Sequence, residues 1–274
     1  MPKLLTQEAV TQFNGRGYFS PVAVLSPEEM ERSRRALAAF EAHEGGKLKG
    51  AVRNKSHLFL KWLHDLACHP KVLDAVEDLI GPNILLYHAQ WFIKEPRTPN
   101  FVSLHQDSAY WALDKPQGLS AWIAFEDCDS ENGCMRVLPG THTVALRHED
   151  RIAPDNMLWR GQTVAETLDE SKAVEMPLKA GEMSLHHARI VHGSGPNRST
   201  RRRIGYSLRY IPTHVARTGP RDSAMLVRGV DEYHYFDPEP SPKADYDPAA
   251  VAFHAEVNRR FMEHYTAAKP ELVA

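Results

Sequence analysis

The chain has 274 residues, of which 42% are hydrophobic and 25% charged, and its formal net charge is −2. These values are typical of a soluble globular protein, and the small net charge gives no reason to expect a nucleic-acid partner. No apolar run reaches the roughly 18 residues of a membrane span, so we expect no membrane association. Three cysteines are too few for a disulfide framework, and together with an N-terminus that lacks signal-peptide order they favour a cytoplasmic location.

The N-terminal region, about residues 1–82, has helical patterns. Ser26 and Glu29 flank Pro27 in the arrangement of a capping box, which marks the start of a helix. Gly15 is expected to end the helix before it, and Pro70 to interrupt the helical region after it. The helices that the sequence predicts here cover residues 6–14, 26–43 and 58–79.

The pattern then changes to short β-rich segments separated by turns, such as Asn132-Gly133 and Pro139-Gly140. No long helix lies between them, which favours an antiparallel sandwich or barrel. The expected strands cover residues 84–93, 102–107, 119–126, 134–138, 173–177, 183–192 and 203–211. We expect a single domain, residues 1–274, with a mainly β core at about 83–212 and flanking helices.

Two long stretches, residues 148–170 and 213–248, have no clean period and carry large aromatic side chains. Long connections in a compact domain are often functional covers, so we interpret both as ordered lid loops. A final helix is expected from 248 to 268. It completes the region of lid loops and C-terminal helix, about residues 213–274.

A His-x-Asp pair, His105 and Asp107, lies near the end of a predicted strand. One intervening residue places both side chains on the same face of an extended strand. Two histidines and one carboxylate form the facial triad of non-haem Fe(II) sites, and His192, just before a glycine-rich turn, is the candidate third ligand. Arg203 follows eleven residues later, and a hairpin between the two strands would bring its guanidinium to the metal site.

Four motifs, taken together and in this order, resemble the phytanoyl-CoA dioxygenase family. They are His105-Gln106-Asp107, the strand Ala121-Trp122-Ile123-Ala124-Phe125-Glu126, the segment from Asn132 to His142, and His192-Gly193-Ser194-Gly195-Pro196-Asn197 followed by Arg203. This family consists of oxygenases that depend on Fe(II) and 2-oxoglutarate and are built on a double-stranded β-helix, or jelly roll. The resemblance covers about residues 15–212 and implies that fold for the core.

The resemblance implies roles for individual residues. His105, Asp107 and His192 match the iron ligands, and Arg203 matches the arginine that pairs with the distal carboxylate of 2-oxoglutarate. The residues that match other cosubstrate-contacting or cavity-lining positions of the family are Ser194, Trp122, Ser120, Gln90 and Trp111. A basic residue from the helical region reaches 2-oxoglutarate in some members, and Arg53 and Lys55 are both candidates here.

Substrate contacts are suggested by the sequence itself. Arg209 lies three alternations after Arg203 on the same predicted strand, so its side chain is expected to point inward as well. His186 shares the face of His192 by the same period, and Trp159 lies on the first long loop. An inward arginine could hold an anionic substrate or balance a buried carboxylate such as Glu126. His186 could line the cavity without binding a metal, and Trp159 could contact substrate or simply pack against the protein.

The family's chemistry implies cosubstrates and products. Fe(II), 2-oxoglutarate and O2 would be used to hydroxylate a small substrate, with release of succinate and CO2. The retained Asp107 favours hydroxylation or desaturation over halogenation. The expected substrate is a small, possibly anionic metabolite: a natural-product intermediate, an amino-acid derivative or a phosphonate. Two alternatives remain open, namely a non-catalytic jelly-roll binding module and a metal-dependent phosphohydrolase that uses His64 and Asp65.

Overall fold

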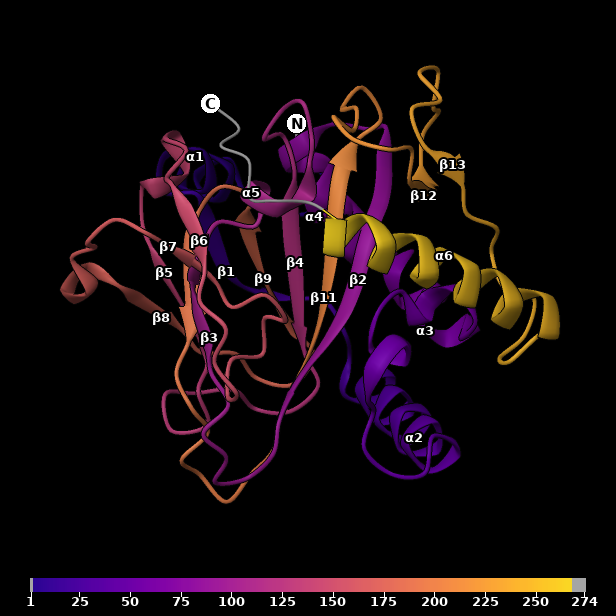
Figure 1. The fold of residues 1–274 in the computed structure, drawn as a ribbon, viewed down its shortest axis with the longest axis horizontal. Helices are drawn as coiled ribbons and strands as arrows, with labels where there is room; N and C mark the ends of the chain where they lie inside the picture. The colour runs from indigo at the N-terminus through magenta and orange to yellow at the C-terminus, as the bar shows by residue number, and fades with distance from the viewer. Residues whose placement is uncertain (1, 268–274) are drawn as a thin grey trace.

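The computed structural model describes residues 2–267, with backbone alone for 264–267. Two antiparallel sheets face each other, and helices cover the outside of the larger one (Figure 1). The helices are α1 (Gln7–Arg16), α2 (Pro27–His43), α3 (Lys61–Ala67), α4 (Pro70–Ile80), α5 (Ser108–Trp111) and α6 (Pro248–Ala267). The expectation of a mainly β core with flanking helices is confirmed.

The larger sheet has seven strands in the order β1-β9-β4-β11-β2-β12-β13. Neighbouring strands are antiparallel except β12 and β13, which pair in parallel. The bounds are β1 (Tyr18–Ala23), β2 (Ile84–Lys94), β4 (Leu119–Ala124), β9 (Glu182–His187), β11 (Arg203–Pro212), β12 (Ser223–Arg228) and β13 (Asp237–Pro238). The central strands β2, β4 and β11 are almost wholly buried, which fits their continuous apolar sequences.

The smaller sheet has four strands in the order β3-β10-β5-β8. Its strands are β3 (Val102–His105), β5 (Met135–Leu138), β8 (Val174–Met176) and β10 (Val191–Ser194). A separate two-stranded sheet joins β6 (His148–Asp150) to β7 (Gln162–Val164). Two facing antiparallel sheets, each built from strands distant in sequence, agree with the jelly roll that the family resemblance implies.

The helix boundaries follow from local chemistry. Ser26 and Glu29 form the predicted capping box at the start of α2, with each side chain bonded to the other residue's backbone N–H. Helix α1 does not stop at Gly15 as expected but continues to Arg16. It ends at Gly17, which adopts the left-handed conformation with φ of 82° and donates its N–H to the carbonyl of Phe13. A C-cap in this conformation is what glycine tolerates at no steric cost.

The strand predicted over residues 183–192 is wrong, because it is two strands in different sheets. The chain leaves the larger sheet after His187 and enters the smaller one at Val191. Ala188 and Ile190, in the crossing between them, are both buried. The apolar run therefore continues through the crossing and hides the break in the sequence.

The hairpin expected between the strands of His192 and Arg203 is also wrong. β10 pairs with β3 and β5, whereas β11 pairs with β2 and β4. The two residues approach each other across the space between the facing sheets. The two long loops are partly ordered as strands, since residues 148–170 contain β6 and β7, and residues 213–248 contain β12 and β13.

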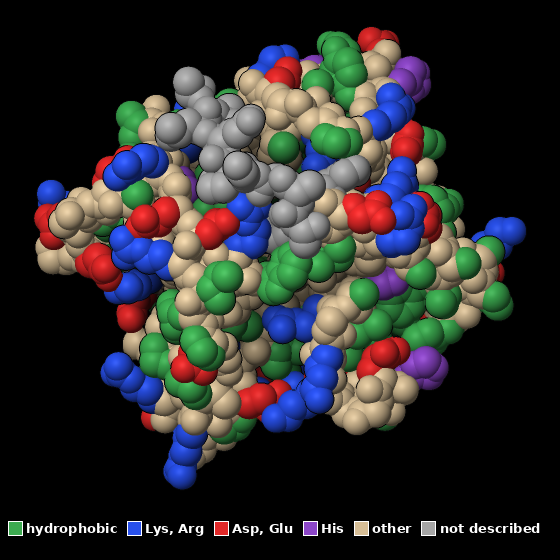
Figure 2. Space-filling view, viewed as in Figure 1, with side chains coloured by type: hydrophobic (Ala, Val, Ile, Leu, Met, Phe, Trp, Pro, Cys, Tyr) green, Lys and Arg blue, Asp and Glu red, His purple; other side chains and the backbone are tan. Residues whose placement is uncertain are grey.

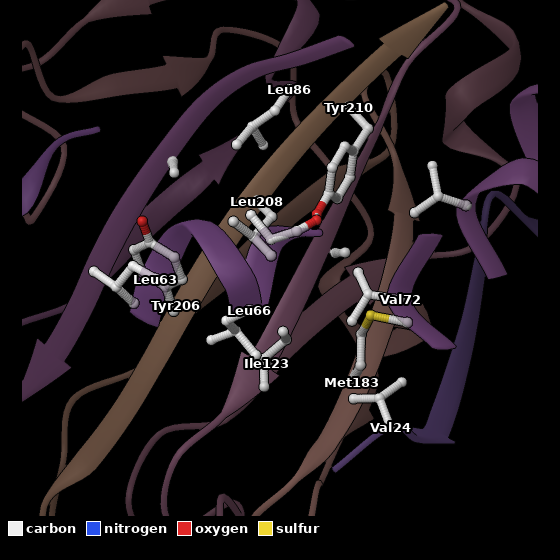
Figure 3. Close-up of a cluster of buried hydrophobic side chains, with 14 of the residues drawn as sticks. Val24, Leu63, Leu66, Val72, Leu86, Ile123, Met183, Tyr206, Leu208 and Tyr210 are labelled. Atoms are coloured by element: carbon white, nitrogen blue, oxygen red, sulfur yellow. The ribbon is translucent and has the colours of Figure 1, made fainter. Parts of the chain in front are cut away.

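The main hydrophobic core lies between the outer helices and the larger sheet (Figure 3). Leu63 and Leu66 of α3 and Val72 of α4 pack there against strand residues such as Ile123 and Leu208. This side of the sheet is closed by packing, so the opposite side is the one that faces the smaller sheet and can hold a site. Within residues 2–267, no helix combines the length and apolar character needed to cross a membrane.

Candidate metal centre and adjoining cavities

His105, Asp107 and His192 lie together between the two sheets. A nitrogen or oxygen atom of each lies within 4.8 Å of the corresponding atoms of the others, and all three are buried. Nε2 of His105 is 3.4 Å from Oδ1 of Asp107, and the two imidazole rings are 4.3 Å apart between centroids. His105 ends β3 and pairs directly with His192 on β10, so sheet pairing itself brings these two ligand candidates together.

Asp107 reaches this cluster by a route that strand alternation does not describe. β3 ends at His105, and Asp107 has helical backbone angles of −55° and −42° just before α5. The expectation that both side chains share one face of an extended strand is therefore wrong. The turn places the carboxylate beside the imidazole instead.

Both histidines are oriented by backbone carbonyl groups. Nδ1 of His105 lies 2.9 Å from the carbonyl oxygen of Ser103, and Nδ1 of His192 lies 3.0 Å from that of Ile190. If each Nδ1 carries the hydrogen that such a bond requires, Nε2 is left as a lone-pair donor to a metal. Burial lowers the pKa of His192 well below its usual value, which favours the neutral, metal-binding form.

Asp107 is held in its ionised form. Burial opposes ionisation, but the charge of Arg209 and a hydrogen bond from His105 outweigh it and keep the pKa of Asp107 well below the usual value. Oδ2 accepts a 3.0 Å hydrogen bond from the hydroxyl of Ser120, and Nε2 of His186 lies 4.0 Å from the same oxygen. Ser120 thus contacts the metal-ligand candidate.

An inner cavity extends from this cluster to Arg203 and is bordered by Ser194 and Trp122. The Arg203 guanidinium is buried and donates through Nη1 to the carbonyl of Gly133 at 3.0 Å and to Ser194 Oγ at 3.4 Å. Its Nε and Nη2 have no hydrogen-bond partner. Trp122 lies beside it, with the ring centre 5.3 Å from the guanidinium carbon.

These orphaned donors fit a carboxylate. A buried guanidinium with free N–H groups binds a carboxylate at two oxygens, and the other end of the cavity holds the His-Asp-His group. A dicarboxylic oxo acid that chelates a metal through one end would present its distal carboxylate to Arg203. The donor set of two imidazoles and one carboxylate suits Fe(II) with open coordination positions.

Two residues of this region carry no clear signal in the sequence. Lys94, the last residue of β2, is fully buried and donates to Ser194 Oγ at 2.7 Å. A lysine at the end of a strand ordinarily suggests exposure to solvent, so its burial could not be predicted. Gly205 of β11 is the other: a Cβ there would lie 1.7 Å from the Trp122 ring, so only glycine leaves room for this indole.

A larger outer cavity of about 600 Å³ also borders on His105 and Asp107. Five of the residues that the sequence predicts to contact substrate or cosubstrate line it: Gln90, Trp111, Trp159, Arg209 and Arg53. Figure 2 shows basic side chains recessed in a hollow on this face of the molecule. Arg209 also lines the inner cavity, whereas His186 lines the inner one alone.

The two basic candidates from the helical region have separate environments. Arg53 lies in the wall of the outer cavity and donates to the carbonyl of Trp91 at 2.9 Å. Lys55 is buried elsewhere, in an ion pair of 2.5 Å with Glu239. The Lys55 ammonium is therefore already paired with a carboxylate of the protein, whereas Arg53 lines the cavity. Arg53 is the better placed of the two to contact a ligand.

His64 and Asp65, the candidate pair for a phosphohydrolase, lie on α3. Asp65 is half-exposed and pairs with Lys61 one turn away, while Nδ1 of His64 lies 3.1 Å from Asp65. Among the described residues, the metal-binding geometry occurs at His105, Asp107 and His192 and does not include this pair. A solvated helix surface accounts for the arrangement.

Comparison with known proteins adds an independent observation. Residues 13–205, more than half of the chain, match the model of the phytanoyl-CoA dioxygenase (PhyH) family. The chain belongs to the phytanoyl-CoA dioxygenase family. The matched segment includes all three metal-ligand candidates and Arg203.

Two curated relatives match between 47% and 60% of the chain. A probable alpha-ketoglutarate-dependent hypophosphite dioxygenase of Stutzerimonas stutzeri is 30% identical over 170 residues, which cover 60% of this chain and 59% of the relative. The human peroxisomal phytanoyl-CoA dioxygenase is 34% identical over 139 residues, covering 47% and 40%. The chain thus spans about half the length of these curated relatives.

Two solved structures match a larger share of the chain than these relatives do. The apo form of ThoJ, described as a non-heme monooxygenase, is 32% identical, has a TM-score of 0.82 and covers 94% of this chain and 98% of its own. SnoK, described as a non-heme alpha ketoglutarate dependent carbocyclase, is 26% identical with a TM-score of 0.65, covering 81% and 91%. The predicted fold and the dependence on iron and 2-oxoglutarate are confirmed at the level of the family.

Proposed function

We propose that this member of the phytanoyl-CoA dioxygenase family is an Fe(II)- and 2-oxoglutarate-dependent dioxygenase that hydroxylates a small anionic metabolite. The observation that carries the proposal is the buried His105, Asp107 and His192 group, which opens onto the unpaired guanidinium of Arg203 on one side and the outer cavity on the other. When bound, the iron and 2-oxoglutarate supply oxidative chemistry that consumes O2, releases succinate and CO2, and delivers one oxygen atom to the substrate.

The residues of the chain would bind and orient the reactants. His105, Asp107 and His192 would hold the metal, and the cavity between them and Arg203 would receive the cosubstrate. Arg203 and Ser194 would hold the distal carboxylate, and Trp122 would close that cavity against water. Burial of the whole group strengthens these electrostatic contacts, because the local dielectric is low.

The outer cavity is the proposed substrate site, because it borders directly on two of the ligand candidates. Arg209 and Arg53 are two cationic side chains in its wall that suit an anionic group, and Gln90 lies 3.4 Å from Arg209. Asp107 and Asp222 border the same cavity. The hypophosphite named for the bacterial relative is also an anion. A volume of about 600 Å³ lies in the range of drug-sized ligands, so we propose a substrate considerably larger than hypophosphite.

Other residues in the walls of the outer cavity suit a ligand that has both apolar and polar groups. Trp111 and Trp159 offer flat apolar surfaces, while Asn156 and Asn258 offer amide groups. A natural-product intermediate or an amino-acid derivative that carries both a ring and an acidic group would use all of these contacts. The three cysteines are free thiols, which suits the reducing cytoplasm that we propose as its location.

The first experiment tests the metal and cosubstrate. Fe(II) and 2-oxoglutarate are added without oxygen, and the weak visible charge-transfer band of the chelate is recorded. We expect the band in the wild type and in His43→Ala, an exposed control, and its loss in His192→Ala. If the wild type gives no band, or His192→Ala keeps it, the assignment is refuted.

A second experiment separates an enzyme from a binding module. Conversion of 2-oxoglutarate to succinate is measured in air across a panel of acidic metabolites of varied size. An oxygenase gives succinate above its uncoupled background with at least one class of compound. A binding module on a jelly roll gives the chelate band without any succinate.

A further inference from the structure

Two basic side chains share one hydroxyl group at the far end of the inner cavity. The ammonium group of Lys94 donates to Ser194 Oγ at 2.7 Å and to the carbonyl of Gly195. Arg203 donates to the same Oγ at 3.4 Å. The two residues are direct partners across the β2–β11 pairing, so strand register fixes their proximity.

No acidic group of the described residues balances these two cations. Both side chains are buried, and among residues 2–267 no aspartate or glutamate contributes to the electrostatics of either one. The thiols of Cys128 and Cys134 are close enough to stabilise a charged Lys94 if they were ionised. Burial raises their pKa values to about 11 and about 12, so both thiols are uncharged at neutral pH. Burying unpaired positive charge is costly, so an empty site favours the loss of a proton.

Lys94 is the group that can release this proton, because arginine keeps its charge. Burial, followed by repulsion from Arg203, lowers the pKa of Lys94 to about 6. The neutral amine therefore predominates in the empty site near pH 7. A bound carboxylate would reverse this balance, since an opposite charge close by favours the protonated form.

We propose that Lys94 is a positioning residue that takes up a proton when 2-oxoglutarate binds, so that its ammonium and Arg203 together hold the distal carboxylate through Ser194. The inference rests on the proposed cosubstrate chemistry and adds a residue to it. Lys94 does not border on the cavity itself, whereas Ser194 and Arg203 do. Its proton is taken from solvent on binding and returned on release.

The pH dependence has a definite sign. Binding raises the pKa of Lys94, so protons and 2-oxoglutarate bind cooperatively. The dissociation constant of 2-oxoglutarate should rise with pH above about 6, by up to about tenfold per pH unit, until the pKa of the complex is reached. Below pH 6 it should be flat, because Lys94 is already charged in the empty site.

Calorimetry of the metal-loaded protein tests the proposal. 2-Oxoglutarate is titrated anaerobically into the Fe(II) form at about pH 7.5 in buffers of low and high ionisation enthalpy, which reports the protons exchanged. We expect uptake of close to one proton by the wild type. Lys94→Met should abolish the uptake, weaken 2-oxoglutarate binding at pH 6 by about tenfold or more, and leave Fe(II) affinity unchanged.

The control is Lys179→Met, which removes an exposed lysine paired with Asp127. It should retain the uptake and the affinity. Binding without proton uptake in the wild type, or an unchanged uptake in Lys94→Met, overturns the proposal while leaving the oxygenase assignment intact. Absence of any 2-oxoglutarate binding by the wild type overturns the proposed function as well. Should Lys94→Met fail to fold, the uptake and pH profile of the wild type decide the question alone.

Discussion

The hydroxyl of Ser120 donates a 3.0 Å hydrogen bond to Oδ2 of Asp107, and both groups are buried. Oδ1, the other oxygen of the carboxylate, is the one that lies 3.4 Å from Nε2 of His105. A residue at the start of β4 therefore fixes how the carboxylate is oriented toward a metal. Such outer contacts orient a metal ligand, and their loss lowers metal affinity.

Replacing Ser120 with alanine should weaken metal binding. We expect the Fe(II) dissociation constant of Ser120→Ala to rise by about 10- to 100-fold, because the carboxylate loses the bond that orients it. Competition against a coloured chelator measures the change. Ser171→Ala, a change on an exposed turn, serves as the control. A metal affinity equal to that of the control would show that Ser120 does not orient the ligand.

Arg209 should act on the substrate more than on 2-oxoglutarate. Its Nη2 lies 3.8 Å from Asp107 and 3.4 Å from Gln90, and it borders both cavities. With a substrate found by the succinate screen, Arg209→Ala should raise the substrate KM by about tenfold or more, as expected for a charge-assisted bond. The KM for 2-oxoglutarate should change less. A substrate KM that matches that of Arg259→Ala, an exposed control, would remove Arg209 from the substrate site.

Gly205 should tolerate no side chain. A Cβ at this position meets the Trp122 ring at 1.7 Å, and both residues belong to central, buried strands. We expect Gly205→Ala to lower the free energy of unfolding by about 1–3 kcal/mol and to weaken 2-oxoglutarate binding, because Trp122 must move. Urea unfolding and the chelate band report the two effects.

Gly15→Ala provides the opposite control. Gly15 lies within α1 with open space around its Cβ position, so alanine there should stabilise the protein by about 0.5–1 kcal/mol. Equal effects at the two glycines would contradict the crowding at Trp122.

The buried ion pair of Lys55 and Glu239 should make the free energy of unfolding depend on pH in the acid range. Burial opposes ionisation, but the Lys55 charge outweighs it and lowers the pKa of Glu239 to about 2. A lowered pKa in the folded state contributes stability that is present above the unfolded value of about 4.5 and is lost as the pH falls towards 2. Glu239→Gln should flatten this dependence in urea unfolding between about pH 5 and pH 2.

The same substitution tests the cost of an unpaired charge. At neutral pH, Glu239→Gln should destabilise the fold by about 3–5 kcal/mol, since it leaves the buried Lys55 ammonium without a negative charge beside it, with the carbonyl of Ser223 as its remaining acceptor. The double variant Lys55→Met with Glu239→Gln should recover part of this loss. A double variant less stable than the single one would indicate that packing, and not charge, dominates here.

The sequence by itself determined the family and the strand-rich centre, and it predicted a candidate metal-binding group. His105, Asp107, His192 and Arg203 were predicted because their types and spacing carry the signal, and the structure brings them to one pair of cavities. The caps of α2 were predictable for a similar reason, since a capping box is a local pattern of hydrogen bonds. Each of these features depends on neighbours in the chain or on a motif of known chemistry.

Only the tertiary structure decided which sheet each strand joins and what surrounds the ligands. The apolar run through Ala188 and Ile190 does not reveal that the chain changes sheets, because burial is the same in both. Likewise, the bond from Ser120 to Asp107 joins β4 to the turn that follows β3, and Lys94 lies beside Arg203 because β2 pairs with β11, a strand far away in the sequence. Period and composition indicate which apolar side chains are buried, whereas the partners of each side chain are set by strand register and by the packing of the two sheets, which the sequence of a single chain does not display.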